Sequence, residues 1–196
     1  YASVDTIPQR LDIAVICTKA AVVPEIVDVC GRAGCKNVIV ISGGFAEAGP
    51  RGASLERAVL ENARRHGMRV LGPNCLGIMR PGNQVNLTFG HGFANAGTIG
   101  LISQSGALCT AILDWALPNK VGFSNVVSLG AEGDIDFGEV LDYMVSDPRT
   151  ENIFLYIEGI KNSRRFMSAL RAAARCKPVL LIKVGKHPAG EKAALS

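Results

Sequence analysis

The chain has 196 residues, of which 48% are hydrophobic, and a formal net charge of +4. This length and composition suffice for one large domain or two small ones with a real core. Lys and Arg are scattered rather than gathered in a stripe interleaved with aromatic residues, so nucleic-acid binding is not expected. No apolar stretch is long enough for a membrane helix and no secretory signal is visible, so we expect no membrane partner.

The six cysteines indicate free thiols rather than a disulfide framework or a metal site. They form no C-x-x-C pair and have no histidines at zinc-ligand spacing. Most of them fall within apolar strand or helix patterns, where Cys behaves as a small hydrophobe. We therefore expect no metal ligands and a reducing, cytoplasmic location.

Strand and helix patterns alternate along the chain. We expect strands at 12–18, 38–42, 69–71, 98–103, 124–129, 153–158 and 178–184. We expect helices at 22–33, 54–66, 107–116, 137–147 and 163–176. Because the strands are apolar on both faces, this order predicts an α/β fold with parallel, doubly wound sheets that are covered by helices on both sides.

A long stretch rich in Gly, Pro and Asn, 72–95, is expected to be irregular and to separate two units. The expected segments are a first unit at 1–79, a linker at 80–96 and a second unit at 97–196. The first unit holds only about three strands, fewer than a doubly wound nucleotide-binding domain normally has. Because the chain also starts at Tyr1 and ends in a polar tail, 185–196, we expect an internal fragment of a longer protein.

The most informative turn is Ser103-Gln104-Ser105-Gly106, which lies between an apolar, β-branched strand and a helix without Gly or Pro. A small, hydroxyl-bearing turn at a helix start presents unpaired backbone N–H groups and the positive end of the helix dipole. This arrangement favours phosphate or carboxylate. Ser and Gly also cap ordinary helices, so a plain capping role stays open at this point.

Ligands of open α/β sheets gather at the carboxyl ends of the strands, so the residues there are the candidates for a site. These strand ends are Thr18-Lys19-Ala20, Ser42-Gly43-Gly44-Phe45, Gly72-Pro73-Asn74-Cys75, Ser103-Gln104-Ser105-Gly106, Gly130 to Asp136, and Glu158-Gly159. No dinucleotide fingerprint, P-loop, hydrolase elbow or zincin motif occurs, so those four classes of enzyme are unsupported.

Several of these residues also have a purely structural interpretation. Gly43 and Gly44 can simply supply positive φ in a tight turn. Cys75 can be another packed thiol. Asp134 and Asp136 precede a helix and fit the role of N-caps.

Glu158 differs, because it is a lone carboxylate at the end of an apolar strand, where burial is expected and a charge needs a partner. We therefore expect it to be functional. His66, His91 and His187 lie away from the strand ends, which argues against a Cys-His or Ser-His catalytic pair.

Two motifs match a known family. Gly72-Pro73-Asn74-Cys75-Leu76-Gly77, followed by the run from Gly100 to Leu108, resembles the α-subunit half of the succinyl-CoA synthetase superfamily and, more closely, ADP-forming acyl-CoA (acetyl-CoA) synthetases. The resemblance covers nearly the whole chain in order. It extends over 111–116, 122–124, 134–138, 155–160 and 177–183. The chain is similar in particular to the synthetase-like module of Pat-type bacterial protein lysine acetyltransferases.

The resemblance implies the C-terminal half of a CoA-binding Rossmann-like domain, followed by a flavodoxin-like succinyl-CoA-ligase domain. It implies CoA binding by Thr18, Lys19, Ala20, Ser42, Gly43, Gly44, Phe45, Asn74 and Cys75. It implies phosphate binding by Ser103, Gln104, Ser105, Gly106 and Ala107. Ser105 and Glu158 are the implied catalytic residues, since Glu158 matches a carboxylate that contacts a phosphorylated histidine.

The implied chemistry is phosphate attack on an acyl-CoA thioester, which gives an acyl phosphate and CoA. A histidine, expected immediately after Ser196, then carries the phosphoryl group to ADP. Such transfer depends on positioning and charge stabilisation, which helix N–H groups and an orienting carboxylate supply. The resemblance also implies ADP or ATP with Mg, an ATP-grasp domain or subunit, and an oligomer. The fragment alone is expected to be inactive.

A second functional hypothesis stays open. In Pat-type proteins the synthetase-like part can act as a degenerate, acyl-CoA-sensing regulatory module of an attached GNAT acetyltransferase domain. The residue after Ser196 and the presence of a GNAT domain would discriminate the two hypotheses.

Overall fold

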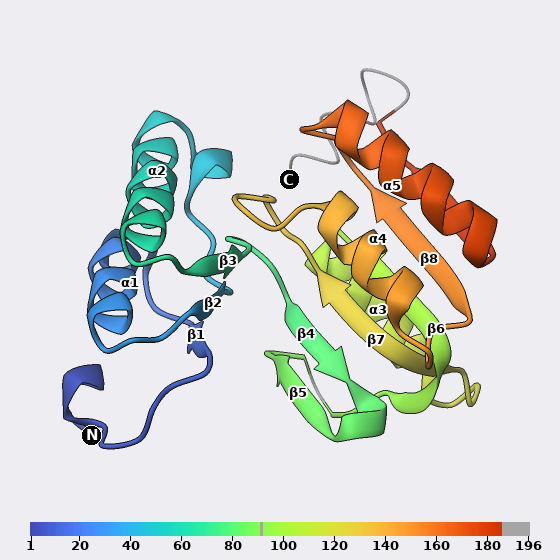
Figure 1. Cartoon of the computed structure of the whole chain (residues 1–196), viewed down its shortest axis with the longest axis horizontal. Coiled ribbons are helices and arrows are strands. Elements are labelled where there is room, and N and C mark those ends of the chain that lie inside the picture. The colour runs from blue at the N-terminus through green and yellow to red at the C-terminus, as the bar shows by residue number, and fades with distance from the viewer. Residues whose placement is uncertain (91, 186–196) are drawn as a thin grey trace.

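The computed structural model describes residues 1–90 and 92–185. It contains two sheets that lie side by side, each with its own helices (Figure 1). The first sheet has the order β1-β2-β3 and the second has the order β5-β4-β7-β6-β8-β9. The strand ends that the sequence singles out are therefore distributed over two neighbouring sheets.

The first sheet is wholly parallel and small. Its strands are β1 (Ala14–Ile16), β2 (Asn37–Val40) and β3 (Arg69–Leu71), and its helices are α1 (Val23–Arg32) and α2 (Pro50–Arg65). One face packs on both helices through alternate residues such as Val38 and Val40. The opposite face contributes Ile39 and Leu71 to the core of the second unit. Helices thus cover one face of this sheet, and the second unit contacts the other.

The second sheet is larger and mixed. Its strands are β4 (Gly77–Arg80), β5 (Val85–Thr88), β6 (Asn95–Ser103), β7 (Gly122–Ser128), β8 (Asn152–Ile157) and β9 (Val179–Lys183). β6 to β9 are parallel, as expected, whereas β4 pairs antiparallel with both β5 and β7. The α/β class with predominantly parallel sheets is confirmed.

The expected irregular stretch at 72–95 is wrong in part, because it contains the antiparallel hairpin of β4 and β5. Each strand has four residues, with only Ile78 and Met79 apolar in the first and Val85 and Leu87 in the second. Val85 and Leu87 do alternate with polar residues, but only over four residues, whereas Ile78 and Met79 are adjacent, so the stretch gives only a weak period-2 pattern. β4 extends the second sheet, although it starts within the segment expected to end the first unit. The division of the chain at 79 and 96 remains a proposal.

Helices cover the second sheet unequally. α3 (Gly106–Ala116) lies on one face with Leu101 and Val126, and α4 (Phe137–Ser146) and α5 (Ser163–Cys176) lie on the other with Ile153 and Leu155 (Figure 1). All expected helices are present with boundaries shifted by a few residues. No helix in the described part of the chain combines the length and apolar character needed to cross a bilayer.

The helix start at Pro50, four residues before the expected start, has a local cause. Proline is favourable in the first helical turn because its missing N–H is not needed there. Gly52 in the same turn lies against the main chain of Phe45, and a Cβ on it would overlap the Phe45 carbonyl oxygen. This close approach fixes the loop after β2 against α2.

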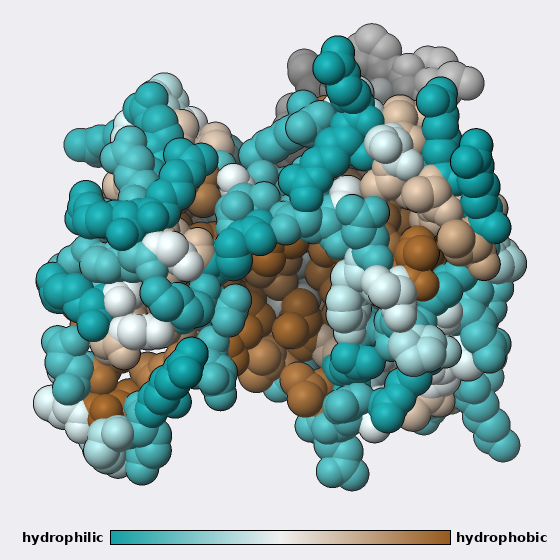
Figure 2. All heavy atoms as spheres, in the orientation of Figure 1, coloured by the Kyte–Doolittle hydropathy of each residue, from teal (hydrophilic) through white to brown (hydrophobic). Residues whose placement is uncertain are grey.

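Direct bonds join the two units. Arg69 on β3 pairs with Asp134 at 2.9 Å and with Glu139 of α4 at 2.7 Å. The Asp134 carboxylate also accepts a hydrogen bond from Val70 N at 2.9 Å. Figure 2 shows apolar atoms in the hollow between the units on one face, while hydrophilic atoms dominate the outer surfaces.

Candidate functional site

The turn between β6 and α3 has the geometry of an anion site. Ser105 is the N-cap of α3 and its Oγ accepts a hydrogen bond from Leu108 N at 3.4 Å. The N–H groups of Ser105, Gly106 and Ala107 pair with no acceptor among the residues that the structure describes. Three donors therefore point outward at the positive end of a helix of 11 residues.

Two polar side chains of the same turn are already bonded. Ser103 is fully buried and its hydroxyl donates to the Ser105 carbonyl at 2.9 Å, which stabilises the turn. Gln104 donates its side-chain N–H to Glu132 and accepts hydrogen bonds from the N–H groups of Glu158 and Gly159. In this structure the open donors of the turn are therefore backbone groups.

Glu158 lies beside this turn at the end of β8. Burial raises the pKa of its carboxyl above the usual value, and the Lys183 ammonium and the Ser105 hydroxyl partly oppose that rise. Lys183 at the end of β9 also donates to the Glu158 carbonyl at 2.8 Å. The structure thus brings the two expected catalytic residues, Ser105 and Glu158, together.

The ends of β1 and β2 form a second group of candidate residues. The Ser42 hydroxyl donates to the Thr18 carbonyl at 2.5 Å. Gly44 adopts a φ of +99°, and a Cβ at this position would lie 3.3 Å from the Ala20 Cβ. Of the two glycines expected to supply positive φ, Gly44 does and Gly43 does not, and the two strand ends are adjacent. Lys19 is exposed next to them.

Backbone N–H groups also gather in the loop after β2, but carboxylates of the chain itself bind them. Glu47 Oε1 accepts from Gly44 N at 2.6 Å and from Phe45 N at 3.2 Å. Glu56, which is buried on α2, accepts from Ala46 N at 3.3 Å. A carboxylate therefore stands where this loop would hold another anion.

The loop after β3 connects the two groups. Asn74 N donates to the Ser42 carbonyl at 3.0 Å, and a Cβ on Gly43 would lie 3.1 Å from Asn74 Oδ1. On the other side, a Cβ on Gly106 would lie 3.6 Å from Leu76 N. The Gly-Pro-Asn-Cys segment thus lies between the end of β2 and the start of α3.

Two expected CoA-binding side chains are buried. Phe45 has no exposed surface and packs in the first core, so neither its side chain nor its main chain is accessible at this strand end. Cys75 is 3% exposed, and burial raises the pKa of its thiol to about 12. Of its two interpretations, the structure favours the packed thiol.

The two aspartates before α4 have different roles. Asp136 is an N-cap, since its Oδ1 accepts from Glu139 N at 3.0 Å. Asp134 instead bonds Arg69 and Val70 across the two units, so its interpretation as a cap is wrong. Its place next to a helix start gave no indication of a partner from the other sheet.

Two charged residues near the site, Lys183 and Lys161, were missed by the sequence analysis. Lys183 was detectable, because its strand runs parallel to β8 and ends opposite Ile157. Lys161 lies on a loop without a motif and donates to the Glu132 carbonyl. Glu132 lies within the candidate range from Gly130 to Asp136, but the sequence did not single it out; it is buried and accepts a hydrogen bond from Gln104.

The histidine in the described part of the chain lies away from the candidate site, and the described residues contain no metal-binding cluster. His66 bonds Asp28 at 2.8 Å on the helices of the first unit, away from the strand ends. His91, His187 and the rest of the tail from 186 lie outside the described residues. Within the described ranges, no three His, Cys, Asp or Glu residues form a group suited to a metal ion.

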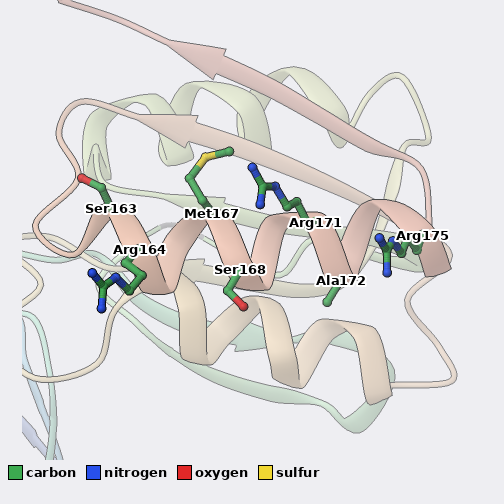
Figure 3. Close-up of a pocket in the computed structure, with 7 residues that line it drawn as sticks. All are labelled: Ser163, Arg164, Met167, Ser168, Arg171, Ala172 and Arg175. Atoms are coloured by element: carbon green, nitrogen blue, oxygen red, sulfur yellow. The ribbon is translucent and has the colours of Figure 1, made fainter.

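A surface groove lies apart from these strand ends. All seven of its lining residues come from α5, among them Met167, Arg171 and Arg175 (Figure 3). Because one exposed helix face lines it, with no residue from a strand end, it is separate from the candidate site.

Comparisons with known proteins agree with this geometry. Residues 96–196 match the family model "Succinyl-CoA ligase like flavodoxin domain" and residues 1–81 match "CoA binding domain". Acetate–CoA ligase [ADP-forming] I of Archaeoglobus fulgidus is 44% identical over all 196 residues, and its subunit alpha counterpart from Pyrococcus furiosus is 42% identical. The chain spans 29% and 42% of these two relatives.

A solved structure agrees with the same assignment. Dinucleotide forming acetyl-coenzyme A synthetase 1 of Ca. Korarchaeum cryptofilum, in complex with phosphate and ADP, has a TM-score of 0.92 at 37% identity. The match covers 99% of this chain and 42% of that one. The chain belongs to the superfamily of ADP-forming acetyl-CoA synthetases and succinyl-CoA ligases, with a CoA-binding domain followed by a succinyl-CoA-ligase-like flavodoxin domain.

Proposed function

We propose that this chain forms the CoA- and phosphate-handling part of an ADP-forming acyl-CoA synthetase. The reaction is acyl-CoA + phosphate + ADP = acid + CoA + ATP. The observation that carries the proposal is the row of three N–H donors at Ser105, Gly106 and Ala107, which have no partner in the described part of the chain and lie beside the Glu158 carboxylate. Phosphate needs donors of this kind, and an imidazole that carries a phosphoryl group needs an orienting carboxylate.

The binding of CoA is proposed at the ends of β1, β2 and β3. Ser42, Gly43 and Asn74 lie together there, with Lys19 exposed beside them as a positive charge for an anionic ligand. The loop at Asn74 continues to the start of α3, so a thioester placed along it would reach the phosphate turn. This contiguity supports phosphate attack on the thioester carbonyl, with the acyl phosphate forming as CoA leaves.

The second half of the reaction needs components outside the described residues. We propose that a histidine C-terminal to β9 enters the space beside Glu158 and accepts the phosphoryl group from the acyl phosphate. An ATP-grasp domain or subunit with Mg then presents ADP to the phosphohistidine. In this scheme the helix donors hold the phosphoryl oxygens, and Glu158 orients the ring and stabilises its positive charge.

The experiment that tests the proposal uses the full-length parent protein. Incubated with acetyl-CoA, phosphate, ADP and Mg²⁺, it should form ATP and free CoA in equal amounts. Incubated with γ-labelled ATP and Mg²⁺, it should acquire acid-labile, base-stable phosphate. Binding of acetyl-CoA without either product would contradict the synthetase and favour the regulatory module of a GNAT-type acetyltransferase.

A further inference from the structure

The Gln104 side chain is bonded at both of its ends. Its Oε1 accepts from Glu158 N at 2.5 Å and from Gly159 N at 2.9 Å, while its Nε2 donates to the Glu132 carboxylate. Backbone N–H groups can only donate, so the atom facing them must be the oxygen. The orientation of the amide is therefore fixed by its partners.

The Gln104 main chain belongs to the phosphate turn. Its N–H donates to the Tyr156 carbonyl of β8 at 3.2 Å, and Ser105 follows as the N-cap of α3. Gln104 thus connects the phosphate turn to β8 through its backbone, and to the N–H groups of Glu158 and Gly159 after β8 through its side chain.

Glu132 holds the outer end of this side chain. It lies on the loop between β7 and α4, is 5% exposed, and has a φ of +50°, which is uncommon for a residue with a side chain. Lys161, from the loop after β8, donates to its carbonyl at 3.2 Å, and Asp136 at the start of α4 is the other nearby charge. A buried carboxylate that faces an amide is costly to retain, so it requires an explanation.

We propose that Glu132 is a positioning residue for the phosphate site: its carboxylate holds the Gln104 amide, and Gln104 fixes the main chain at Glu158 against the phosphate turn. The inference rests on the proposed function and deepens it. Without the Glu132 carboxylate the Gln104 amide is free to rotate, and the Glu158 and Gly159 N–H groups lose their acceptor. The Glu158 carboxylate then leaves its place beside Ser105.

Asp147 provides a matched comparison for a purely structural carboxylate. It is also buried, but it accepts from Asn125 Nδ2 at 2.6 Å and Thr150 Oγ1 at 2.8 Å and pairs with Arg80 at 3.0 Å. It follows the last residue of α4, away from Gln104. Its replacement should cost stability without moving Glu158.

The test compares Glu132→Leu with Glu132→Gln in the full-length protein. Leu removes the acceptor and should lower kcat for ATP formation by about 10-fold or more, with little change in the KM for acetyl-CoA. Gln keeps a carbonyl acceptor for the Gln104 amide and should restore kcat to within about threefold of wild type. The Asp147→Asn control should lower Tm and leave kcat unchanged.

Two further measurements keep the inference falsifiable. Amide hydrogen exchange at Glu158 and Gly159 should accelerate in Glu132→Leu and recover in Glu132→Gln, whether or not the wild type makes ATP; unchanged exchange overturns the inference. Gln104→Leu should reproduce the loss of kcat, and the double variant should be no worse than either single one. If the loss of kcat in the double variant equals the product of the two single losses, the residues have independent roles and the inference is overturned. If Glu132→Leu does not fold, the same exchange measurement on Glu132→Ala, which also removes the acceptor of the Gln104 amide, decides in its place.

Discussion

The two loops rich in backbone donors, one after β2 and one after β6, differ in what already occupies them. In the loop after β2, Glu47 binds the N–H groups of Gly44 and Phe45. In the turn after β6, the N–H groups of Ser105, Gly106 and Ala107 pair with no acceptor among the described residues. The two loops have similar local sequences, with small residues and glycine at a strand end. In one loop a carboxylate of the chain itself binds the N–H groups, and in the other these groups are open to a ligand.

The helices that follow the two loops explain the difference. After β2 a three-residue 3₁₀ helix, Ala46–Ala48, turns the chain so that Glu47 folds back on its own N–H groups. After β6 an α-helix of 11 residues starts at once, and among the described residues only the N–H of Leu108 in its first turn has a capping partner. The dipole of the longer helix adds to its open donors, so the turn after β6 is the better site for a doubly charged anion.

The largest expected effect concerns the carboxylate beside the open turn. Glu158→Gln should lower the rate of ATP formation from acyl-CoA, phosphate and ADP by about 100-fold or more, because a neutral amide cannot stabilise a charged imidazole. Steady-state kinetics of the full-length enzyme measure this effect. Glu151→Gln, at an exposed carboxylate just before the same strand, serves as the control. Equal rates in both variants would remove Glu158 from the mechanism.

A single N–H group of the open turn can be deleted with little disturbance. Gly106 is the first residue of α3, where proline is favourable, and Ser105 has the extended backbone (ψ 117°) that a residue before proline prefers. Gly106→Pro should therefore keep the fold and weaken phosphate binding by about 10- to 100-fold, the contribution of one hydrogen bond to a charged group.

Gly106→Ala is the matched control, because it adds a Cβ in ordinary van der Waals contact (3.6 Å from Leu76 N) but keeps the N–H group. Calorimetric titration with phosphate compares the two variants. Equal affinities for phosphate would mean that the N–H donors of this turn do not bind it.

The fold could be predicted from the sequence wherever burial imposes a period. β3 was predicted to the residue, because the apolar pair Val70 and Leu71 is buried and is followed directly by Gly72 and Pro73. The hairpin of β4 and β5 was missed, because each strand has only four residues. In β4 the buried positions do not match the apolar residues, and in β5 no residue is fully buried. β4 pairs antiparallel with β7, and β5 pairs with β4. These pairings determine that the two segments form strands, and they cannot be inferred from the local sequence.

The residues of the candidate site at the strand ends could be predicted, but the contacts of its loop carboxylates could not. The rule that ligands gather at the carboxyl ends of parallel strands led to Ser105 and Glu158, which the structure places together. Glu132 and Glu47 lie on loops, where their contacts with Gln104 and Gly44 depend on how the chain folds back. The order of residues alone contains no signal for such contacts.

The occupied loop can be opened by removing its carboxylate. Glu47→Gln should raise the affinity for CoA about three- to tenfold, since the anionic ligand then meets N–H groups without a competing negative charge. Fluorescence or calorimetric titration with CoA measures it. Glu61→Gln, on the exposed side of α2, is the control for a simple change of net charge. An equal gain in both variants would show a long-range charge effect, and a loss in Glu47→Gln would show that the carboxylate holds the loop in its binding shape.

The last prediction concerns the stability of the fold against pH, without any ligand. Burial raises the pKa of Glu132 to about 7, with the hydrogen bond from the Phe137 backbone and the Lys161 charge opposing the rise. An unfolded Glu titrates near pH 4.3, so between about pH 4.3 and 7 the folded state binds more protons than the unfolded state. The free energy of unfolding should therefore fall by about 3 kcal/mol as the pH rises through this range, and change little from this group well above it. Glu132→Gln should remove that slope in urea unfolding series at pH 5, 6 and 7. If the slope persists in the variant, the pH dependence of stability comes from another group, and Glu132 is not the titrating residue behind the turn after β6.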